Sequence, residues 1–165
     1  MLTIASPRFR SIVFGVIVGL AVVIASGLGQ LATFPNLGWY GGLTKPAFSP
    51  PNWIFGPVWT TLYILMAFAA WRIMRLPNSG QRSVALLFFF GQLVLNAAWS
   101  WMFFALHNPL LGLINIIPQF ALIILGMITF YRLDRMSGWL LVPLALWVAF
   151  ATILNAAVWR LIAWA

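Results

Sequence analysis

The side chains of this sequence that could take part in chemistry are mainly aromatic rings and amides. Asp134 is the single acidic residue, His107 is the single histidine, and cysteine is absent. Paired-carboxylate hydrolysis, two-metal catalysis and serine–histidine–aspartate triads therefore lack the groups they need, and cysteine ligation of a metal is excluded. A lone histidine at a helix break is more often solvated than bound to haem iron. We expect no metal site and no required cofactor, so the chain should act chiefly by binding.

Ten tryptophans occur among the 165 residues. Indole prefers the membrane–water boundary, which explains Trp71, Trp139 and Trp164 near the ends of apolar stretches. Three others lie well inside such stretches: Trp99, Trp101 and Trp147. Their positions predict that the interior of a helix bundle presents aromatic faces.

Helical spacing shows which side chains could converge, since residues three or four apart share a helix face. Trp59 and Tyr63 share one face, and Asn96 and Trp99 share another. A third face combines an indole with small, aliphatic and amide side chains: Trp147, Ala151, Leu154 and Asn155. A pocket walled by indoles, a phenol and amides suits a large, flat, apolar ligand such as a tetrapyrrole, a sterol or a polycyclic drug.

The two asparagines need hydrogen-bond partners, because unpaired polar groups are costly at membrane depth. For Asn155 we favour a link between helices over contact with a ligand. For Asn96, which lies beside Trp99, both interpretations are open.

The elements that must position these residues belong in lipid. Hydrophobic residues make up 64% of the chain and charged residues 6%, with a mean hydropathy of +1.02, whereas soluble domains are about 25% charged. A helix needs about 20 apolar residues to cross a bilayer. The sequence supplies five such segments, approximately 11–30, 54–71, 83–106, 110–131 and 138–159. We predict an all-α integral membrane protein, a five-transmembrane-helix bundle that forms one domain over residues 1–165.

The segment at 11–30 could instead be a cleaved signal peptide with Arg8 and Arg10 as its basic start. Its apolar core is longer than the ~7–15 residues usual for a signal peptide, and no A-x-A cleavage site follows promptly. We therefore expect an uncleaved helix. Gly15 and Gly19 form a GxxxG pair in it, which we interpret as packing within the bundle rather than as a dimer contact.

The net charge of +8 predicts contact with membrane lipids rather than nucleic acid, because the basic residues are scattered between apolar runs. Lys45 and Arg160 would lie on one side of the membrane. The other side would carry the remaining basic residues: Arg8, Arg10, Arg72, Arg75, Arg82, Arg132 and Arg135. The positive-inside rule then places the N-terminus in the cytoplasm if the protein lies in an inner membrane. The sequence leaves open whether a bacterial cell membrane or an outer membrane holds it.

A proline-rich segment at 31–53 joins the first two spans and is predicted to form a lid loop. Its prolines disfavour helix, and its two adjacent glycines permit tight turns. Phe48, Trp53 and Phe55 are too apolar for a free linker and should be buried, so the loop should fold back over the end of the bundle. Lys45 carries its only charge and is expected to attract an acidic group of a ligand. The lid residues are Trp39, Lys45, Pro46, Pro50, Pro51 and Trp53.

Three stretches of the chain resemble the translocator protein family, also known as tryptophan-rich sensory proteins or peripheral-type benzodiazepine receptors. They are WYGGLTKPAFSPPNWIFGPVWTTLY (39–63), LNAAWSWMFF (95–104) and LWVAFATILNAAVWR (146–160). They occur in the family's order, and the resemblance covers essentially the whole chain. It implies a five-helix bundle, usually homodimeric, whose ligand cavity lies towards the end covered by the first loop, with porphyrins such as protoporphyrin IX as ligands.

Carried over residue by residue, the resemblance implies one set of ligand-binding residues: Phe55, Trp59, Tyr63, Asn96, Trp99, Trp147, Ala151 and Leu154. Mitochondrial relatives also bind cholesterol. The sterol-recognition pattern proposed for them has an aromatic residue where this chain has Ala156 and Ala157, so the pattern is incomplete here.

The leading hypothesis is a membrane-embedded binding protein for porphyrins or other tetrapyrroles, acting in their sensing, transport or turnover. One alternative is a light-dependent porphyrin-degrading enzyme in which Trp59 and Trp147 pass electrons. A translocator of cholesterol or other lipophilic ligands and a passive membrane scaffold are further alternatives. A proton-driven exporter is disfavoured, because no span carries a carboxylate.

Overall fold

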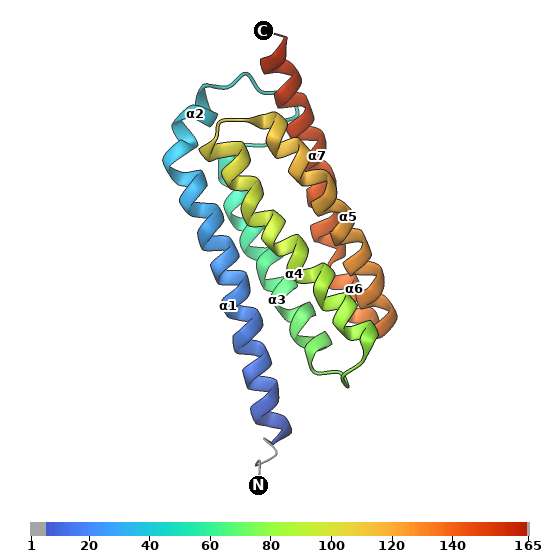
Figure 1. The fold of residues 1–165 in the computed structure, drawn as a ribbon. Helices are drawn as coiled ribbons and strands as arrows, with labels where there is room; N and C mark the ends of the chain where they lie inside the picture. Colours follow the sequence, from blue (N-terminus) through green and yellow to red (C-terminus); the bar gives the residue numbers. More distant parts are fainter. Residues whose placement is uncertain (1–5, 165) are drawn as a thin grey trace.

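The computed structural model describes residues 6–164, which form helices and connecting turns without a strand. Five helical segments within this range are long and apolar enough to cross a membrane: Pro7–Gly42, Asn52–Met74, Gly80–Ala105, Pro109–Leu133 and Arg135–Ala163. They lie side by side as one elongated bundle (Figure 1). The prediction of an all-α, five-helix membrane bundle is confirmed.

Seven α-helices make up these segments: α1 (Pro7–Thr33), α2 (Leu37–Gly42), α3 (Phe55–Met74), α4 (Gly80–Ser100), α5 (Pro109–Leu133), α6 (Arg135–Leu140) and α7 (Val142–Ala163). Single 3₁₀ turns at Phe34–Asn36 and Asn52–Ile54 lead from α1 into α2 and into α3. A π-helical turn, Trp101–Ala105, ends the third segment.

Side-chain caps explain where several of these helices begin. The hydroxyl of Ser6 accepts a hydrogen bond from the backbone N–H of Phe9 at 3.2 Å, with proline at the first helical position of α1. Ser79 caps α4, and Asn108 caps α5 by accepting from the N–H of Leu111 at 3.0 Å. Such caps satisfy backbone donors that have no partner inside the helix.

The lid loop predicted at 31–53 is wrong in its first half, because the chain stays helical through Gly42. Pro35 sits in the first turn of the Phe34–Asn36 segment, where a missing backbone N–H is tolerated. No described glycine takes a positive φ, so the glycine pair at 41 and 42 is accommodated within α2. The non-helical connection is confined to residues 43–51.

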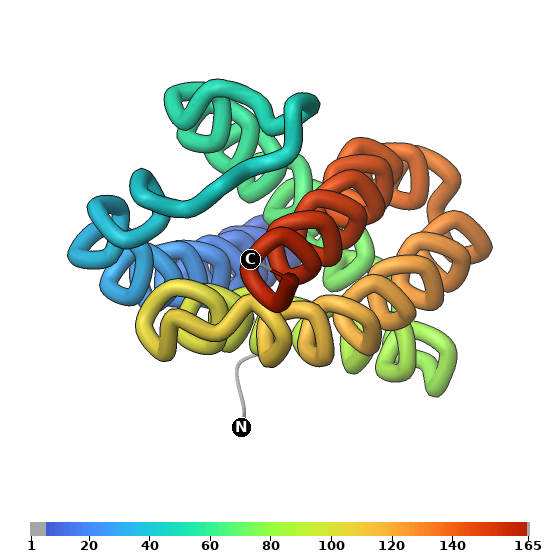
Figure 2. The backbone as a smooth tube through the Cα atoms, turned by 90° about the horizontal axis from the view of Figure 1, so that it is seen from above, coloured from blue at the N-terminus to red at the C-terminus, as the bar shows by residue number. Residues whose placement is uncertain are grey.

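The helices form two packed sets that share α4. Helix α4 packs along α5, α5 packs along α7, and α1 contacts both α3 and α4. Seen from above, residues 43–51 cross from α2 to α3 over the end of the bundle (Figure 2). This crossing lies at the same end as the C-terminal end of α7, and the first helix starts at the other end (Figure 1).

The half of the bundle near the start of α1 is filled by closely packed side chains, and we call it the closed half. Met66, Ala69, Ala70 and Ile73 of α3 have no exposed surface there. Phe89 and Phe130 stack beside them, with ring centroids 5.8 Å apart. Small residues permit close helix contact in lipid, where apolar burial contributes little.

Candidate functional site

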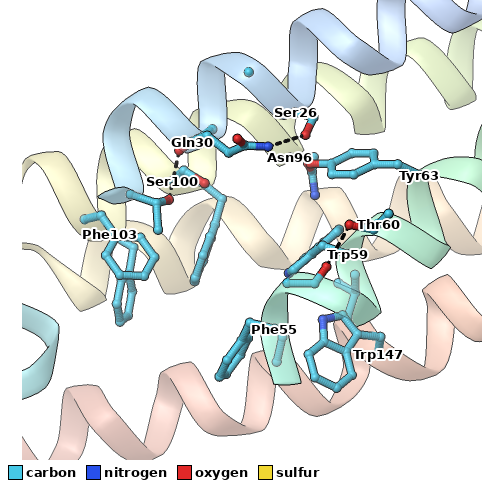
Figure 3. Close-up of a pocket in the computed structure, with 18 of the residues that line it drawn as sticks. Ser26, Gln30, Phe55, Trp59, Thr60, Tyr63, Asn96, Ser100, Phe103 and Trp147 are labelled. Atoms are coloured by element: carbon cyan, nitrogen blue, oxygen red, sulfur yellow. Dashed lines mark hydrogen bonds between the residues drawn. The ribbon is translucent and has the colours of Figure 1, made fainter. Parts of the chain in front are cut away.

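A cavity of about 810 Å³ occupies the other half of the bundle, which we call the open half. It lies between α1, α3, α4, α5 and α7, beneath α2 (Figure 3). The cavity is bordered by all eight residues predicted to bind a ligand: Phe55, Trp59, Tyr63, Asn96, Trp99, Trp147, Ala151 and Leu154. Its volume falls in the range of about 300–1,000 Å³ that is usual for small-molecule sites.

Aromatic rings from three helices form the walls. On α3, Trp59 and Tyr63 lie one turn apart with ring centroids separated by 5.5 Å. Phe55, one turn earlier, meets Trp147 of α7 edge-on at 5.7 Å. On α4, Trp99 stacks on Phe103 of the π-helical turn at 4.9 Å. Offset and edge-on ring contacts of this kind hold large side chains in fixed positions.

Asn96 connects two walls of the cavity and keeps a free donor. Its Oδ1 accepts a hydrogen bond of 2.6 Å from the hydroxyl of Tyr63, which joins α4 to α3. Within residues 6–164 its Nδ2 group has no hydrogen-bond partner, although the residue is only 7% exposed and borders the cavity. The link between helices is therefore established, and contact of the Nδ2 group with a ligand stays a prediction.

Asn155 uses its whole amide to hold helices together, as the sequence favoured. Its Oδ1 accepts a hydrogen bond from the indole of Trp99 at 3.0 Å, and its Nδ2 donates to the carbonyl of Pro109 at 2.7 Å. These bonds connect α7 to α4 and to the start of α5. The amide lies so close to Gly112 that a Cβ atom there would sit 2.9 Å from Oδ1.

Trp101 faces away from the cavity, so the prediction that this indole lies in the bundle interior is wrong. Trp101 is 46% exposed, and its indole donates to the carbonyl of Leu28 at 3.1 Å. The π-helical turn instead buries Phe103 and Phe104. Helical spacing is consistent with this position, because Trp101 lies two residues after Trp99 and so on nearly the opposite side of the helix.

None of the predicted lid residues borders the cavity, although they lie at the correct end of the molecule: Trp39, Lys45, Pro46, Pro50, Pro51 and Trp53. Tyr40 of α2 borders it instead, packed against Phe104 with ring centroids 5.5 Å apart. The ammonium of Lys45 lies 4.7 Å from the centre of the Tyr40 ring and donates to the carbonyls of Gly41 and Leu43. Attraction of an acidic ligand group by Lys45 stays a prediction.

Two aromatic residues of the lid contradict the burial expected from their apolar character. Trp53 is 73% exposed and Phe48 is 50% exposed, whereas Phe55 is half-buried as part of the cavity wall. Trp53 lies in the 3₁₀ turn before α3, at the end of the bundle. An exposed indole at this level suits the membrane–water boundary, so lipid contact can replace burial inside the protein.

His107 is exposed, as predicted, and it joins the turn after the third segment to the end of α1. Its Nε2 atom lies 2.8 Å from Oδ1 of Asn36, and its ring stacks on Trp39 at 4.5 Å. The residue adopts a left-handed backbone conformation, with φ of 50°. These contacts fix α2 against the end of α4.

Sequence reasoning missed several polar residues that border the cavity: Ser26, Gln30, Thr60, Ser100 and Gln119. Gln119 of α5 is only 2% exposed, and its amide forms no hydrogen bond to another described residue. A usable signal existed, because Gln92, Asn96 and Ser100 are spaced by four residues, as are Asn115 and Gln119. This spacing places each set on one helix face.

The cavity wall carries no charged side chain and no histidine among the described residues. Residues 6–164 also contain no cluster of three or more metal-ligating side chains. The chemistry that the wall offers is stacking on aromatic faces together with hydrogen bonding to neutral groups. The indole nitrogens of Trp59 and Trp147 donate to no described residue, so both are free to bond to an acceptor on a ligand.

Comparison with known proteins agrees with this arrangement. A sequence profile of the TspO/MBR family matches residues 15–160. A tryptophan-rich protein TspO from Archaeoglobus fulgidus is 40% identical over 86% of this chain and 92% of its own length. The protein of the same name from Chlorobaculum tepidum is 34% identical over 87% and 92%. The human translocator protein is 35% identical over 76% of this chain and 75% of its own.

Proposed function

The chain belongs to the TspO/MBR family of membrane proteins, and we propose that it binds porphyrins or closely related tetrapyrroles, such as protoporphyrin IX, in their sensing, transport or turnover. The observation that carries the proposal is the uncharged cavity of about 810 Å³ with Trp59, Trp99 and Trp147 in its walls. Large aromatic faces match a flat conjugated ring, because stacking combines contact area with favourable quadrupole geometry.

The polar groups of the cavity fit the edges of such a ring. Asn96 presents an Nδ2 donor, and the indoles of Trp59 and Trp147 present N–H donors, none of them bonded to another described residue. Carbonyl, carboxylate or ring-nitrogen acceptors on a ligand would satisfy them. Donors left unpaired in an apolar cavity cost about 1–3 kcal/mol each, so a ligand with matching acceptors gains affinity.

Titration of the purified protein with protoporphyrin IX in the dark tests this function. We expect saturable quenching of tryptophan fluorescence, with weaker binding for Trp147→Ala and Trp59→Ala. Trp139→Ala is the matched control, because Trp139 is 62% exposed and lies at the far end of the bundle from the cavity. Quenching that never saturates, or that all three variants lower equally, would overturn the proposal.

A second candidate function is light-dependent degradation of the bound porphyrin. It is favoured by one observation, the position of Trp59 beside Tyr63 at 5.5 Å, both on the cavity wall. An indole and a phenol in contact can relay an electron to or from an excited ligand. Illumination of the complex separates the two functions. Loss of the porphyrin absorption band that Trp59→Phe prevents without loss of binding supports degradation, and a stable band supports binding alone.

We also propose that the N-terminus lies in the cytoplasm if the protein occupies an inner membrane. The end of the bundle that begins α1 carries Arg72, Arg75 and Arg82 as well as the two arginines of the turn around Asp134. This excess of basic residues on one side supports the orientation under the positive-inside rule. Protease added to intact spheroplasts that carry a tag on either terminus would test it: the N-terminal tag should be protected and the C-terminal tag cleaved, and the reverse pattern would overturn the orientation.

A further inference from the structure

The cavity is not closed between α1 and α3. Three residues on the α1 edge border the cavity and are also exposed: Val23, Gln30 and Phe34. Three on the α3 edge do the same: Gly56, Thr60 and Ile64. Val23 is 66% exposed and Ile64 is 64% exposed. The two rows therefore form the rims of a lateral opening rather than a sealed wall.

The opening has a floor and a roof, so it faces sideways. At its floor, the indole of Trp71 on α3 donates to the carbonyl of Ser11 on α1 at 3.0 Å. A Cβ atom at Gly15 would lie 3.5 Å from the same indole, so the helices are in van der Waals contact there. At its roof, Leu37 and Tyr40 of α2 border the cavity, and residues 43–51 cross from α2 to α3 (Figure 2). The lid end is partly covered, because Leu37 and Asn52 border the cavity there and are exposed, whereas the side between the two helices is open along three residues of each rim.

No contact latches the two rims together. The bond between Trp71 and Ser11 is the one side-chain hydrogen bond between α1 and α3 that residues 6–164 contain. The polar groups on the rims bond within their own helices: Gln30 donates to Ser26 at 2.9 Å, and Thr60 donates to the carbonyl of Gly56 at 2.9 Å (Figure 3). Separation of the rims would therefore break no hydrogen bond between helices.

The rims lie inside membrane-spanning segments, so the opening meets lipid rather than water. Both rims belong to segments, Pro7–Gly42 and Asn52–Met74, that each contain a stretch long and apolar enough to cross a bilayer. A molecule that reaches the opening must already be dissolved in the bilayer. The side chains of Gln30 and Thr60 at the rims would hydrogen-bond to the polar edge of an amphipathic molecule as it passes. Such bonds matter because an unpaired polar group is costly in hydrocarbon.

We propose that the cavity is loaded laterally, from the leaflet of the bilayer that surrounds the lid end, through the opening between α1 and α3. The proposal rests on the proposed function, because it supposes that the cavity holds a ligand. It specifies the ligand class as apolar or amphipathic molecules that partition into membranes. It assigns α2 a roofing role, because Leu37 and Tyr40 of α2 border the cavity at the end that carries the lid.

Substitutions on the rim test this route. A Cβ atom at Gly27 would have no neighbour within 4 Å, so Gly27→Phe should fold normally while its ring narrows the opening; Gly27 also borders the cavity. Thr60→Phe narrows it from the opposite rim. Gly38→Phe is the matched control, because a Cβ atom there is equally free and the residue lies on α2 outside the cavity wall.

The readout is the rate at which protoporphyrin IX quenches tryptophan fluorescence of the protein in phosphatidylcholine nanodiscs. We expect both the association and the dissociation rates to fall about tenfold in each rim variant, because a narrower passage raises the barrier in both directions. The control should bind at the wild-type rate. Unchanged rates in both folded rim variants would overturn the lateral route.

A measurement on the unmodified protein gives a second test that does not depend on any variant. The loading rate should follow the number of porphyrin molecules per lipid and should not change when the sample is diluted at a constant ratio of porphyrin to lipid. A rate that follows the aqueous porphyrin concentration would instead point to access past the lid and would overturn the proposal. If the wild-type protein shows no saturable binding at all, the proposed function fails, and this outcome is distinct from either kinetic result.

Discussion

The closed half and the open half of the bundle are built by the same helices, yet only one of them encloses a cavity. In the closed half, α3 presents Ala69 and Ala70, both without exposed surface. In the open half, the same helix presents Trp59 and Tyr63 towards its neighbours. Small side chains let helices approach in lipid, whereas stacked indoles and phenols act as spacers. Residue size along one helix therefore decides where the bundle closes.

The two halves also differ in how their helices are joined. The closed half is joined at its end by an ion pair in which Arg72 contacts the carboxylate of Asp134 through two hydrogen bonds, of 2.7 and 3.0 Å. The open half is joined across its walls by neutral bonds from Tyr63 to Asn96 and from Trp99 to Asn155. These bonds hold the walls at a fixed separation where packing alone would let them collapse. The comparison makes four predictions, taken in order of decreasing effect.

The largest effect is expected from a glycine in the closed half. A Cβ atom at Gly138 would clash with Cβ and Cα of Tyr131, and the backbone of α5 cannot yield. Gly138→Ala should therefore lower the free energy of unfolding by about 3 kcal/mol, measured by thermal unfolding in detergent.

The matched substitution in the open half is Gly19→Ala, because a Cβ atom at Gly19 would have no neighbour within 4 Å. It should be neutral or stabilise by up to about 1 kcal/mol, since alanine favours helix. Equal unfolding temperatures for the two variants would contradict the division into closed and open halves.

The second effect concerns the links that hold the open half apart. Asn155→Leu removes the acceptor of the Trp99 indole and the donor to the Pro109 carbonyl. Two buried polar groups would then lack partners, and we expect a loss of about 2 kcal/mol in stability together with weaker ligand binding. Thr152→Val is the control on the same helix, because the Thr152 hydroxyl donates only to the carbonyl of Val148 in its own helix. A control that destabilises as much as Asn155→Leu would show that α7 responds to any polar deletion.

The third effect depends on pH and belongs to the closed half. Hydrogen bonds from Arg72, and then from Ser137, hold the pKa of Asp134 well below its usual range. A carboxylate with a lowered pKa in the folded state contributes stability that is complete above its unfolded pKa of about 4 and is lost as the pH falls towards the folded pKa. An asparagine in place of Asp134 can still cap the N-terminus of α6, but it carries no negative charge. Asp134→Asn should therefore cost about 1 kcal/mol at neutral pH, because both partners are partly exposed.

Thermal unfolding between pH 7 and pH 3 measures this effect. The wild-type protein should lose stability below about pH 4, and the difference between wild type and Asp134→Asn should shrink over the same interval. Two unfolding curves that stay parallel down to pH 3 would show that the ion pair contributes nothing measurable.

The sequence predicts the number of spans and most of the cavity wall because both depend on strong local signals. Long apolar stretches define the spans, and the spacing of Trp59 and Tyr63, or of Trp147 and Ala151, holds in a regular α-helix. Depth within a span does not fix a helix face, and Trp101, two residues after Trp99, lies on nearly the opposite face. The predicted lid extends too far, because glycine and proline usually disfavour helix, whereas α2 accommodates both glycines at its end. The lateral opening depends on how α1 and α3 diverge, and no local pattern encodes that divergence.

The smallest effect is expected at Gln119, where the consequences for stability and for binding should have opposite signs. The residue is 2% exposed as a whole and borders the cavity, and its amide forms no hydrogen bond with residues 6–164. An amide without a partner on the wall of an apolar cavity costs free energy, whereas an apolar group of similar shape does not, so Gln119→Leu should leave stability unchanged or raise it by up to about 1 kcal/mol. The antiparallel pairing of α4 with α5 places Gly91 against Leu122, which puts Gln119 near the level of Asn96. A ligand that bonds to this level of the cavity should then bind about fivefold more weakly to Gln119→Leu.

Ile123→Leu is the control, because Ile123 lies one turn deeper on α5 and is buried outside the cavity wall. It should change neither stability nor binding free energy by more than about 1 kcal/mol. A loss of stability in Gln119→Leu would mean that the amide serves the closed half as an internal link, and the boundary between the two halves would then lie nearer the lid than the cavity wall indicates.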